Sequence, residues 1–159
     1  MEDIESIYNN IRLSCYKISE IISVINPLES CEIISKNTSS DEVKNLDLIT
    51  NNIMIKEFSK NKNIKYLISE ENENIININP NGNYLVAFDP LDGSSNIDSN
   101  ITIGTIFCVY KIDKKTLDNI IIGDSVVSAG YCLYGGSTQL ILADKINGVN
   151  LYVMNKINK

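Results

Sequence analysis

The first part of the chain carries apolar residues at helical spacing. Apolar side chains recur every three or four residues through the first 25 positions, which places them on one face of a helix. Pro27 follows the last of them and is typical of a helix end. We therefore predict an N-terminal helix that buries one stripe of side chains: Ile4, Ile7, Tyr8, Ile11, Cys15, Ile18, Ile22 and Ile25.

A second helix is predicted after the polar segment SKNTSSDEVKN, residues 35–45. Ser40 or Asp41 can cap it, because the side-chain oxygens of serine and aspartate accept hydrogen bonds from the first free N–H groups of a helix. Steps of three and four residues again mark the face that we expect to be buried: Val43, Leu46, Ile49 and Ile53.

Beyond residue 60 the pattern changes to short apolar runs between polar or glycine-containing segments. Such runs predict buried strands at residues 64–69, 84–88 and 103–110, and two further strands at residues 136–143 and 148–154. We interpret residues 70–83 as an Asn-rich loop ending in a turn at Pro80-Asn81-Gly82, and residues 123–136 as a short helix between glycines. With no repeat and no linker, the pattern predicts one α+β or layered α/β unit.

Composition excludes several classes of function. The net charge of −6 argues against nucleic acid or an anionic membrane as the main partner, because both attract basic surfaces. The chain has no histidine, which excludes Ser-His-Asp triads and zinc sites built on imidazole. No apolar run is long enough to cross a bilayer, and the acidic N-terminus is unlike a signal peptide. We expect a cytoplasmic protein with reduced, buried thiols at Cys15, Cys31, Cys108 and Cys132.

The segment FDPLDGSSNID, residues 88–98, is the strongest candidate for a functional motif. A strand ending at Phe88 would point Asp89 outward, and Pro90 would turn the chain so that Asp92 comes back beside Asp89. Two carboxylates that close repel each other unless one is protonated or a cation lies between them. Oxygen ligands favour Mg²⁺ or Mn²⁺, so the segment predicts a metal site.

A glycine and three polar residues, Gly93-Ser94-Ser95-Asn96, follow the two aspartates directly. Glycine lets the backbone approach a ligand, and hydroxyls with successive N–H groups can cradle phosphate oxygens. A polar surface turn is the alternative interpretation. Metal ligands followed at once by a phosphate cradle favour a phosphatase site over that alternative.

Three more carboxylates join this site if the first two predicted strands are parallel neighbours. Glu70 and Glu71 follow the first strand, so they would share the carboxyl edge of the sheet with Asp89 and Asp92. Open α/β sheets bind their ligands at that edge. Taken singly, the glutamate pair would be a solvated strand end and Asp47 an ordinary residue on a helix surface. Taken together, the five residues favour an acidic site.

The chain resembles the class I fructose-1,6-bisphosphatase family, which includes sedoheptulose-1,7-bisphosphatase, in the string AFDPLDGSSNID followed by TIGTIF. The strings DEVKNLD, SEE, SAGYCLYG and NGVN also occur in the family's order. Inositol monophosphatase and its relatives share only a DPLDG-type core. The resemblance implies an inositol-monophosphatase-like fold of the sugar phosphatases, with helices packed on a mixed sheet. It also implies that residues 1–159 form the family's N-terminal domain and that the C-terminal domain is absent.

The resemblance further implies a role for each residue of the motif. Asp47 and Glu71 would orient and deprotonate the attacking water. Residues 35–44 would form a mobile loop that closes toward Asp47. Mg²⁺, with Mn²⁺ as a substitute, would be held by Glu70, Asp89, Asp92 and the carbonyl of Leu91. The 1-phosphate of the sugar would bind to Asp92, Gly93, Ser94, Ser95 and Asn96.

The implied activity is removal of the 1-phosphate of fructose 1,6-bisphosphate, a hydrolase reaction of gluconeogenesis and carbohydrate metabolism, by a homotetramer or dimer. The family's second domain supplies a further glutamate ligand and the side chains that hold the distal phosphate and the sugar. The N-terminal residues do not reproduce the family's AMP-binding sequence, so we expect no AMP inhibition. Three alternatives stay open: a non-catalytic domain that binds Mg²⁺ and phosphate, a sedoheptulose-1,7-bisphosphatase, and an inositol-phosphate phosphatase.

Overall fold

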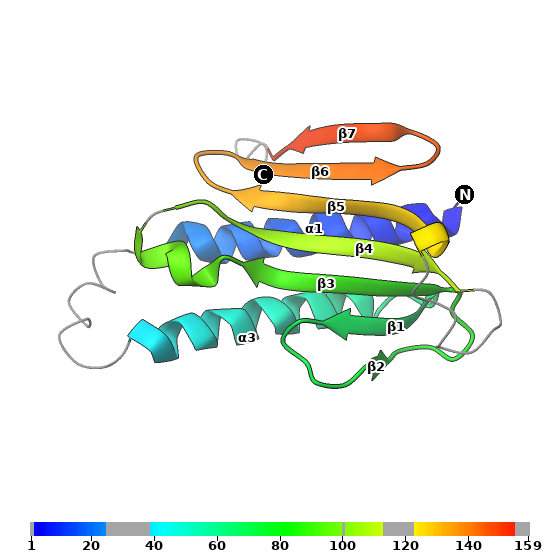
Figure 1. The fold of residues 1–159 in the computed structure, drawn as a ribbon, viewed down its shortest axis with the longest axis horizontal. Coiled ribbons are helices and arrows are strands. Elements are labelled where there is room, and N and C mark those ends of the chain that lie inside the picture. The colour runs from blue at the N-terminus through cyan, green and yellow to red at the C-terminus, as the bar shows by residue number, and fades with distance from the viewer. Residues whose placement is uncertain (1, 25–38, 100, 113–122, 155–159) are drawn as a thin grey trace.

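The computed structural model describes residues 2–24, 39–99, 101–112 and 123–154, which form two helices packed on one sheet (Figure 1). The helices are α1 (Glu2–Val24) and α3 (Ser39–Phe58), with 3-10 turns at η1 (Ser94–Ser99) and η3 (Gly123–Ser125). The strands are β1 (Ile64–Ser69), β2 (Ile76–Asn77), β3 (Tyr84–Asp92), β4 (Ile103–Lys111), β5 (Val126–Tyr134), β6 (Thr138–Asp144) and β7 (Gly148–Val153). The predicted α+β arrangement of helices on a mixed sheet is confirmed.

The strands follow the order β2-β1-β3-β4-β5-β6-β7 across the sheet. β1 and β3 are parallel, and every other neighbouring pair in this order is antiparallel. Ser69 at the end of β1 lies beside Phe88 of β3, and the N–H of Glu70 donates to the Phe88 carbonyl at 3.0 Å. The predicted parallel pair is therefore confirmed, and its shared carboxyl edge carries the acidic residues.

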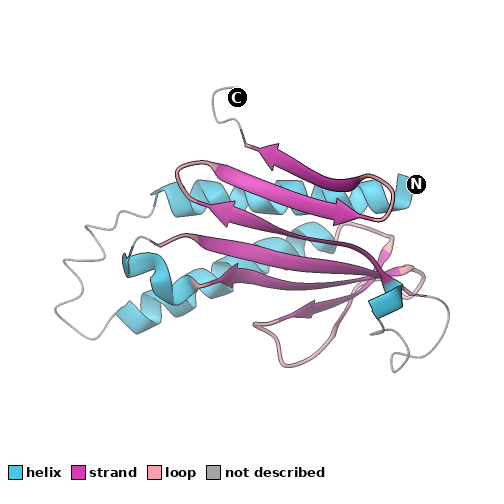
Figure 2. Ribbon diagram, turned by 45° about the horizontal axis from the view of Figure 1, so that its top comes forward, coloured by secondary structure: helices cyan, strands magenta, loops and turns pink. Residues whose placement is uncertain are grey.

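Both helices lie on the same face of the sheet (Figure 2). The stripe predicted for α1 faces this core, with Ile7, Ile11 and Ile18 fully buried. Ile25 and Pro27 lie outside the described residues, as does Cys31. Neither described helix is long and apolar enough to span a bilayer.

The buried face of α3 differs from the prediction. The residues that face the core are Leu46, Thr50, Asn51, Met54 and Phe58, whereas Ile49 is 38% exposed. Leu46 is buried and Ile53 packs against the core as predicted. The prediction did not include Thr50 and Asn51, yet both are buried with their polar atoms hydrogen-bonded. The helix begins at Ser39, so the two predicted cap residues, Ser40 and Asp41, lie inside it. The side chain of Val43 is not described.

The segment 123–136 is a strand rather than the predicted helix. Only Gly123–Ser125 is helical, and β5 then pairs with β4 on one side and β6 on the other. Side chains alternate along it: Cys132 and Tyr134 are buried, while Tyr131 and Leu133 are exposed. This period of two is typical of a strand. The helix was predicted instead because glycines flank the segment.

The Asn-rich segment 70–83 contains a short strand and the predicted turn. β2 pairs with β1 through Ile76 and Asn77, which the sequence pattern did not predict because two residues are too few to show a period. The turn at Pro80-Asn81-Gly82 is confirmed, since the Gly82 N–H donates to the Asn79 carbonyl at 3.0 Å.

The opposite face of the sheet is not covered by any helix that the structure describes (Figure 1). Small side chains cross this face in register on four neighbouring strands: Ala87, Cys108, Ala129 and Ala143. Cys108 is half-buried there, while Cys15 and Cys132 are buried on the helix side of the sheet. These three described cysteines are free thiols, as predicted.

Candidate functional site

Asp89 and Asp92 both lie on β3, on either side of an irregularity at Pro90. The strand continues to Asp92, so the predicted turn at Pro90 is wrong. Both aspartates pair with residues of β4, and the register shifts between them. Proline has no N–H to give to a sheet, and a bulge accommodates it. Instead the N–H of Leu91 donates to Asp89 Oδ1 at 3.1 Å, which fixes the orientation of that carboxylate.

The buried side-chain hydroxyls of Thr105 and Tyr134 support the bulge at Pro90. Thr105 Oγ1 donates to the Pro90 carbonyl at 2.8 Å and lies 2.6 Å from the hydroxyl of Tyr134. Thr105 is fully buried and Tyr134 is 4% exposed, so water does not compete for these bonds. Because the Pro90 carbonyl lies between the two aspartates, this pair fixes the backbone that carries both.

Replacing Thr105 by valine is expected to lower the free energy of unfolding by about 1–3 kcal/mol. The change keeps the shape of the side chain but leaves the Pro90 carbonyl and the Tyr134 hydroxyl without their buried partner. Urea unfolding followed by circular dichroism measures the effect, and Thr105→Ser, which keeps the hydroxyl, is the matched control. A Thr105→Val protein as stable as the wild type would show that the pair does not hold the bulge.

The predicted phosphate-binding residues form a tight turn after β3. Gly93 has φ = 78°, a left-handed conformation that side chains rarely adopt, and its carbonyl accepts from the N–H of Asn96 at 2.8 Å. Ser94 and Asn96 are half-buried and Ser95 is exposed. The turn therefore brings the polar groups of residues 93–96 together beside Asp92.

Asp47 on α3 reaches this turn from the helix layer. Its Oδ2 accepts a hydrogen bond from Ser94 Oγ at 3.2 Å, although the two residues are far apart in the sequence. Its Oδ1 is buried and has no hydrogen-bond partner among the described residues. A buried carboxylate oxygen without a partner is costly, and a bound cation or water would satisfy it.

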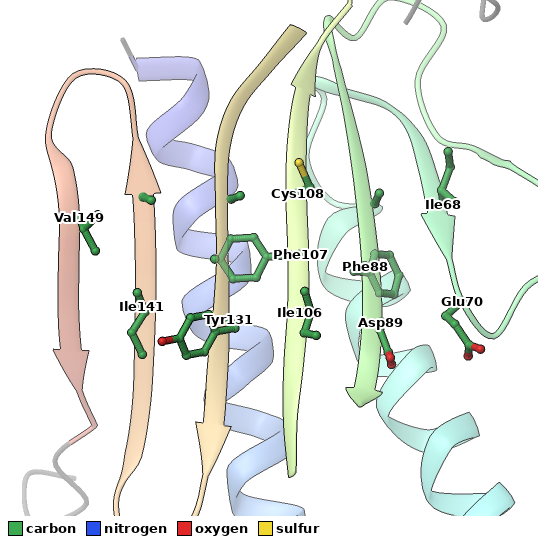
Figure 3. A pocket seen from close by; sticks show the side chains of 14 residues that line it. Ile68, Glu70, Phe88, Asp89, Ile106, Phe107, Cys108, Tyr131, Ile141 and Val149 are labelled. Carbon is green, nitrogen blue, oxygen red and sulfur yellow. The ribbon is translucent and has the colours of Figure 1, made fainter. Parts of the chain in front are cut away.

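Glu70 and Glu71 lie in the turn that follows β1, and both are exposed. Figure 3 shows the side chains of Glu70 and Asp89 next to each other at the ends of their strands. The N–H of Glu71 donates to Ser69 Oγ at 3.2 Å. Helix α3, β3 and the turn after β1 thus bring together all five acidic residues that the sequence analysis named.

The charges of these carboxylates act on one another. Burial raises the pKa of Asp89 above its ordinary value, and the charges of Asp92, Glu70 and Asp47 raise it further against the opposing Leu91 hydrogen bond. Burial also raises the pKa of Asp47, with Ser94 opposing and Glu70 adding to the rise. The pKa of Glu71 is also raised, mainly by partial burial and next by the charge of Asp47. The residues form an acidic cluster in which neighbouring negative charges contribute to the raised pKa values of Asp47, Glu71 and Asp89.

The donor set of this cluster suits a hard cation. Carboxylate and carbonyl oxygens are the ligands that Mg²⁺ and Mn²⁺ prefer. Asp47 Oδ1 supplies an unpartnered buried oxygen, and no described lysine or arginine forms an ion pair with the cluster. In the part of the chain that the structure describes, no three acidic side chains converge on one point as they lie. The oxygen atoms are therefore of the kind that binds Mg²⁺ or Mn²⁺. The carboxylates are close enough to shift one another's pKa values, but they do not point at one shared position.

The sequence analysis missed the residues that hold the acidic ones in place. These are Asn51, Ser69, Thr105 and Tyr134, all buried and all hydrogen-bonded to a segment of the site or to one another. Buried polar residues inside apolar runs are the sequence feature that could have identified them. The mobile loop was predicted at residues 35–44. Residues 35–38 lie outside the described part of the chain, and residues 39–44 belong to α3.

A family model described as "Fructose-1-6-bisphosphatase, N-terminal domain" matches residues 2–158. The chain therefore belongs to the fructose-1,6-bisphosphatase family.

Relatives and solved structures agree with this assignment. A class 1 fructose-1,6-bisphosphatase of Halorhodospira halophila is 38% identical over 93% of this chain and 46% of its own length. Fructose-1,6-bisphosphatase 1 of Bos taurus is 43% identical over 74% of this chain and 36% of its own. The holo crystal structure of the Leishmania major enzyme superposes with a TM-score of 0.76 at 30% identity, covering 97% of this chain and 47% of that one. The chain thus spans about half the length of the relatives it matches.

Proposed function

We propose that this chain supplies the metal- and phosphate-binding part of a Mg²⁺-dependent phosphatase that removes the 1-phosphate of fructose 1,6-bisphosphate. The observation that carries the proposal is the contact between Asp47 and Ser94, because it joins the acidic cluster to the turn at residues 93–96. A phosphatase needs these two features side by side, one for a cation and one for the phosphate.

Mg²⁺, or Mn²⁺ in its place, is the proposed cofactor. Glu70, Asp89, Asp92 and the Leu91 carbonyl would hold it, and all four residues lie at the carboxyl edge of β1 and β3. A divalent cation held there would supply charge neutralisation on the phosphoryl oxygens and would lower the pKa of a bound water. The mutual repulsion of the carboxylates supports a cation at this place, and the unpartnered oxygen of Asp47 could accept a hydrogen bond from a water that the cation holds.

Asp47 and Glu71 are the proposed groups that orient and deprotonate the attacking water. Asp47 is held on one side by Ser94, so its second oxygen is free to accept a hydrogen bond from water. Both residues have raised pKa values, which brings a carboxylate base closer to the pH at which it works. Gly93 to Asn96, with Asp92, would hold the 1-phosphate through backbone N–H groups and hydroxyls.

Fructose 1,6-bisphosphate is the preferred substrate because the relatives named above are fructose-1,6-bisphosphatases. Sedoheptulose 1,7-bisphosphate is the second sugar to test, and an inositol phosphate is the third. We place the protein in the cytoplasm, because three relatives from rice species, each 36% identical, are named cytosolic fructose-1,6-bisphosphatases. We expect it to act as a dimer or tetramer without nucleic acid or membrane partners.

Phosphate release from fructose 1,6-bisphosphate by the purified chain, with and without Mg²⁺, tests the proposal. We expect release that requires Mg²⁺ and that exceeds the release by an Asp89→Asn variant. Binding of Mg²⁺ and phosphate without any release would instead identify a non-catalytic binding domain. Sedoheptulose 1,7-bisphosphate and inositol 1-phosphate, assayed in parallel, separate the three substrate classes.

A further inference from the structure

Asn51 joins the helix that carries Asp47 to the turn that carries Glu70 and Glu71. It lies one helical turn after Asp47 on α3, and its side chain is on the same side of the helix. Its Oδ1 accepts from Ser69 Oγ at 2.8 Å, and its Nδ2 donates to Asn72 Oδ1 at 2.9 Å. The two partners bracket the two glutamates in the sequence, so one amide group contacts both ends of the turn.

The bonds continue from Asn51 into the backbone of the turn. Ser69 Oγ, which donates to Asn51, also accepts from the N–H of Glu71 at 3.2 Å. The N–H of Asn72 donates to the Ser69 carbonyl at 3.2 Å and closes the turn. On its other side the turn is bonded to β3 through the N–H of Glu70. The turn is therefore held between β3 and α3, and Asn51 makes the attachment to α3.

The chemistry of this position requires a side-chain amide. Asn51 must accept one hydrogen bond and donate another, and it is only 6% exposed, so water cannot replace either partner freely. An aspartate could accept from Ser69 but could not donate to Asn72, and an apolar residue could do neither. The carboxylates that Asn51 draws together repel one another, so the bond acts against a force that pushes the turn away from the helix.

We infer that Asn51 is a positioning residue, which sets the separation between Asp47 on α3 and Glu70 and Glu71 on the turn after β1. Asn51 touches neither phosphate nor cation in this role. It acts by holding the turn, and the inference rests on the proposed function because that function assigns the three carboxylates to metal binding and water activation.

Mn²⁺ binding to the full chain, measured from the electron paramagnetic resonance signal of the free ion, tests the inference. Asn51→Ala is expected to weaken Mn²⁺ affinity by about 10–100-fold, the range typical for residues that orient metal ligands. Asn72→Ala removes only one of the two bonds from an exposed position, so it cannot collapse the core, and a smaller loss is expected.

Asn61→Ala is the matched control. Asn61 is another buried asparagine, 8% exposed, whose Nδ2 donates to Ser6 Oγ at 3.0 Å and to Asn10 Oδ1 at 2.7 Å, away from the acidic cluster. Asn61→Ala removes buried hydrogen bonds as Asn51→Ala does, and it should leave Mn²⁺ affinity unchanged. Wild-type affinity in a folded Asn51→Ala protein, or equal losses in both variants, would overturn the inference.

Amide hydrogen exchange at Glu71, measured by NMR, tests Asn51 without a metal. Exchange at this N–H should be faster in Asn51→Ala and unchanged in Asn61→Ala, because only the first change releases Ser69 Oγ. If the wild-type chain binds no Mn²⁺, the proposed metal site is refuted. The exchange rate at Glu71 would still show whether Asn51 holds the turn. Unchanged exchange in Asn51→Ala would overturn that role whatever the metal does.

Discussion

The Asp89→Asn variant is expected to lose at least about 100-fold in Mg²⁺ and Mn²⁺ affinity while keeping its fold. Removing a ligand should cost no less than removing a group that only orients one, for which 10–100-fold is typical. Asparagine keeps the oxygen that accepts from the Leu91 N–H, so the bulge at Pro90 should survive. Isothermal titration with MgCl₂ and far-ultraviolet circular dichroism measure the two properties separately.

The same variant is expected to unfold at a higher temperature than the wild type at neutral pH without metal. Folding raises the pKa of Asp89, so the stability linked to its protonated form is present at low pH and is lost as pH rises through the raised value. Asparagine is neutral at every pH, so the variant should keep at neutral pH the stability that Asp89 provides only when protonated. Asp124→Asn, an exposed aspartate beside the opposite end of the sheet, is the control for removing one charge. A variant that keeps Mg²⁺ affinity would refute the assignment of Asp89 as a ligand.

The Asp47→Asn variant is expected to slow hydrolysis of fructose 1,6-bisphosphate by about 10²–10⁴-fold, the usual contribution of a general base. Asparagine can still accept from Ser94 Oγ, so the attachment of α3 to the turn at residues 93–96 should persist. It cannot take a proton from water. Because Asp47 is not among the proposed metal ligands, Mn²⁺ affinity should change far less than turnover.

Phosphate release and Mn²⁺ affinity should therefore be measured on the same Asp47→Asn preparation. Equal losses in both would mean that Asp47 binds the cation directly. Unchanged turnover with normal affinity would remove Asp47 from the mechanism and leave Glu71 as the remaining candidate base. A Glu71→Gln variant distinguishes the contributions of the two carboxylates.

Most of the fold could be predicted from periodicity, and the errors have physical causes. The stripe of α1 was clear because five of its seven buried residues are apolar or aromatic and only Ser14 and Ser19 are polar. On α3, Leu46 is buried and Ile53 packs against the core as predicted, whereas Ile49 is exposed. Thr50 and Asn51 were missed because they are polar and yet buried. Thr50 donates to the Leu46 carbonyl of its own helix, and Asn51 depends on partners from a distant segment. In the same way, β5 was hidden by its flanking glycines, although Cys132 and Tyr134 alternate with exposed neighbours as in any half-buried strand.

For the candidate site, sequence reasoning identified the charged groups but not their supports. From the sequence, Glu70, Asp89 and Asp92 could be placed at one edge only on the condition that the two strands are parallel neighbours, which β1 and β3 are. The bulge at Pro90 could not be foreseen, since it depends on how β4 continues beside β3. Thr105 and Tyr134 support that bulge from two other strands, and only three-dimensional contacts reveal such a pair.

The strand order of the sheet also has a consequence for how the chain folds. From β3 to β7 each strand pairs with its successor in the sequence, so these contacts close short loops and should form early. The acidic site needs α3 and β1 to join this meander through more distant contacts, such as the one between Asp47 and Ser94. We expect pulse-labelled amide exchange to find β4 and β5 protected before α3. Ligand binding would then depend on the last step of folding, so that only completely folded chains would present the proposed phosphate site.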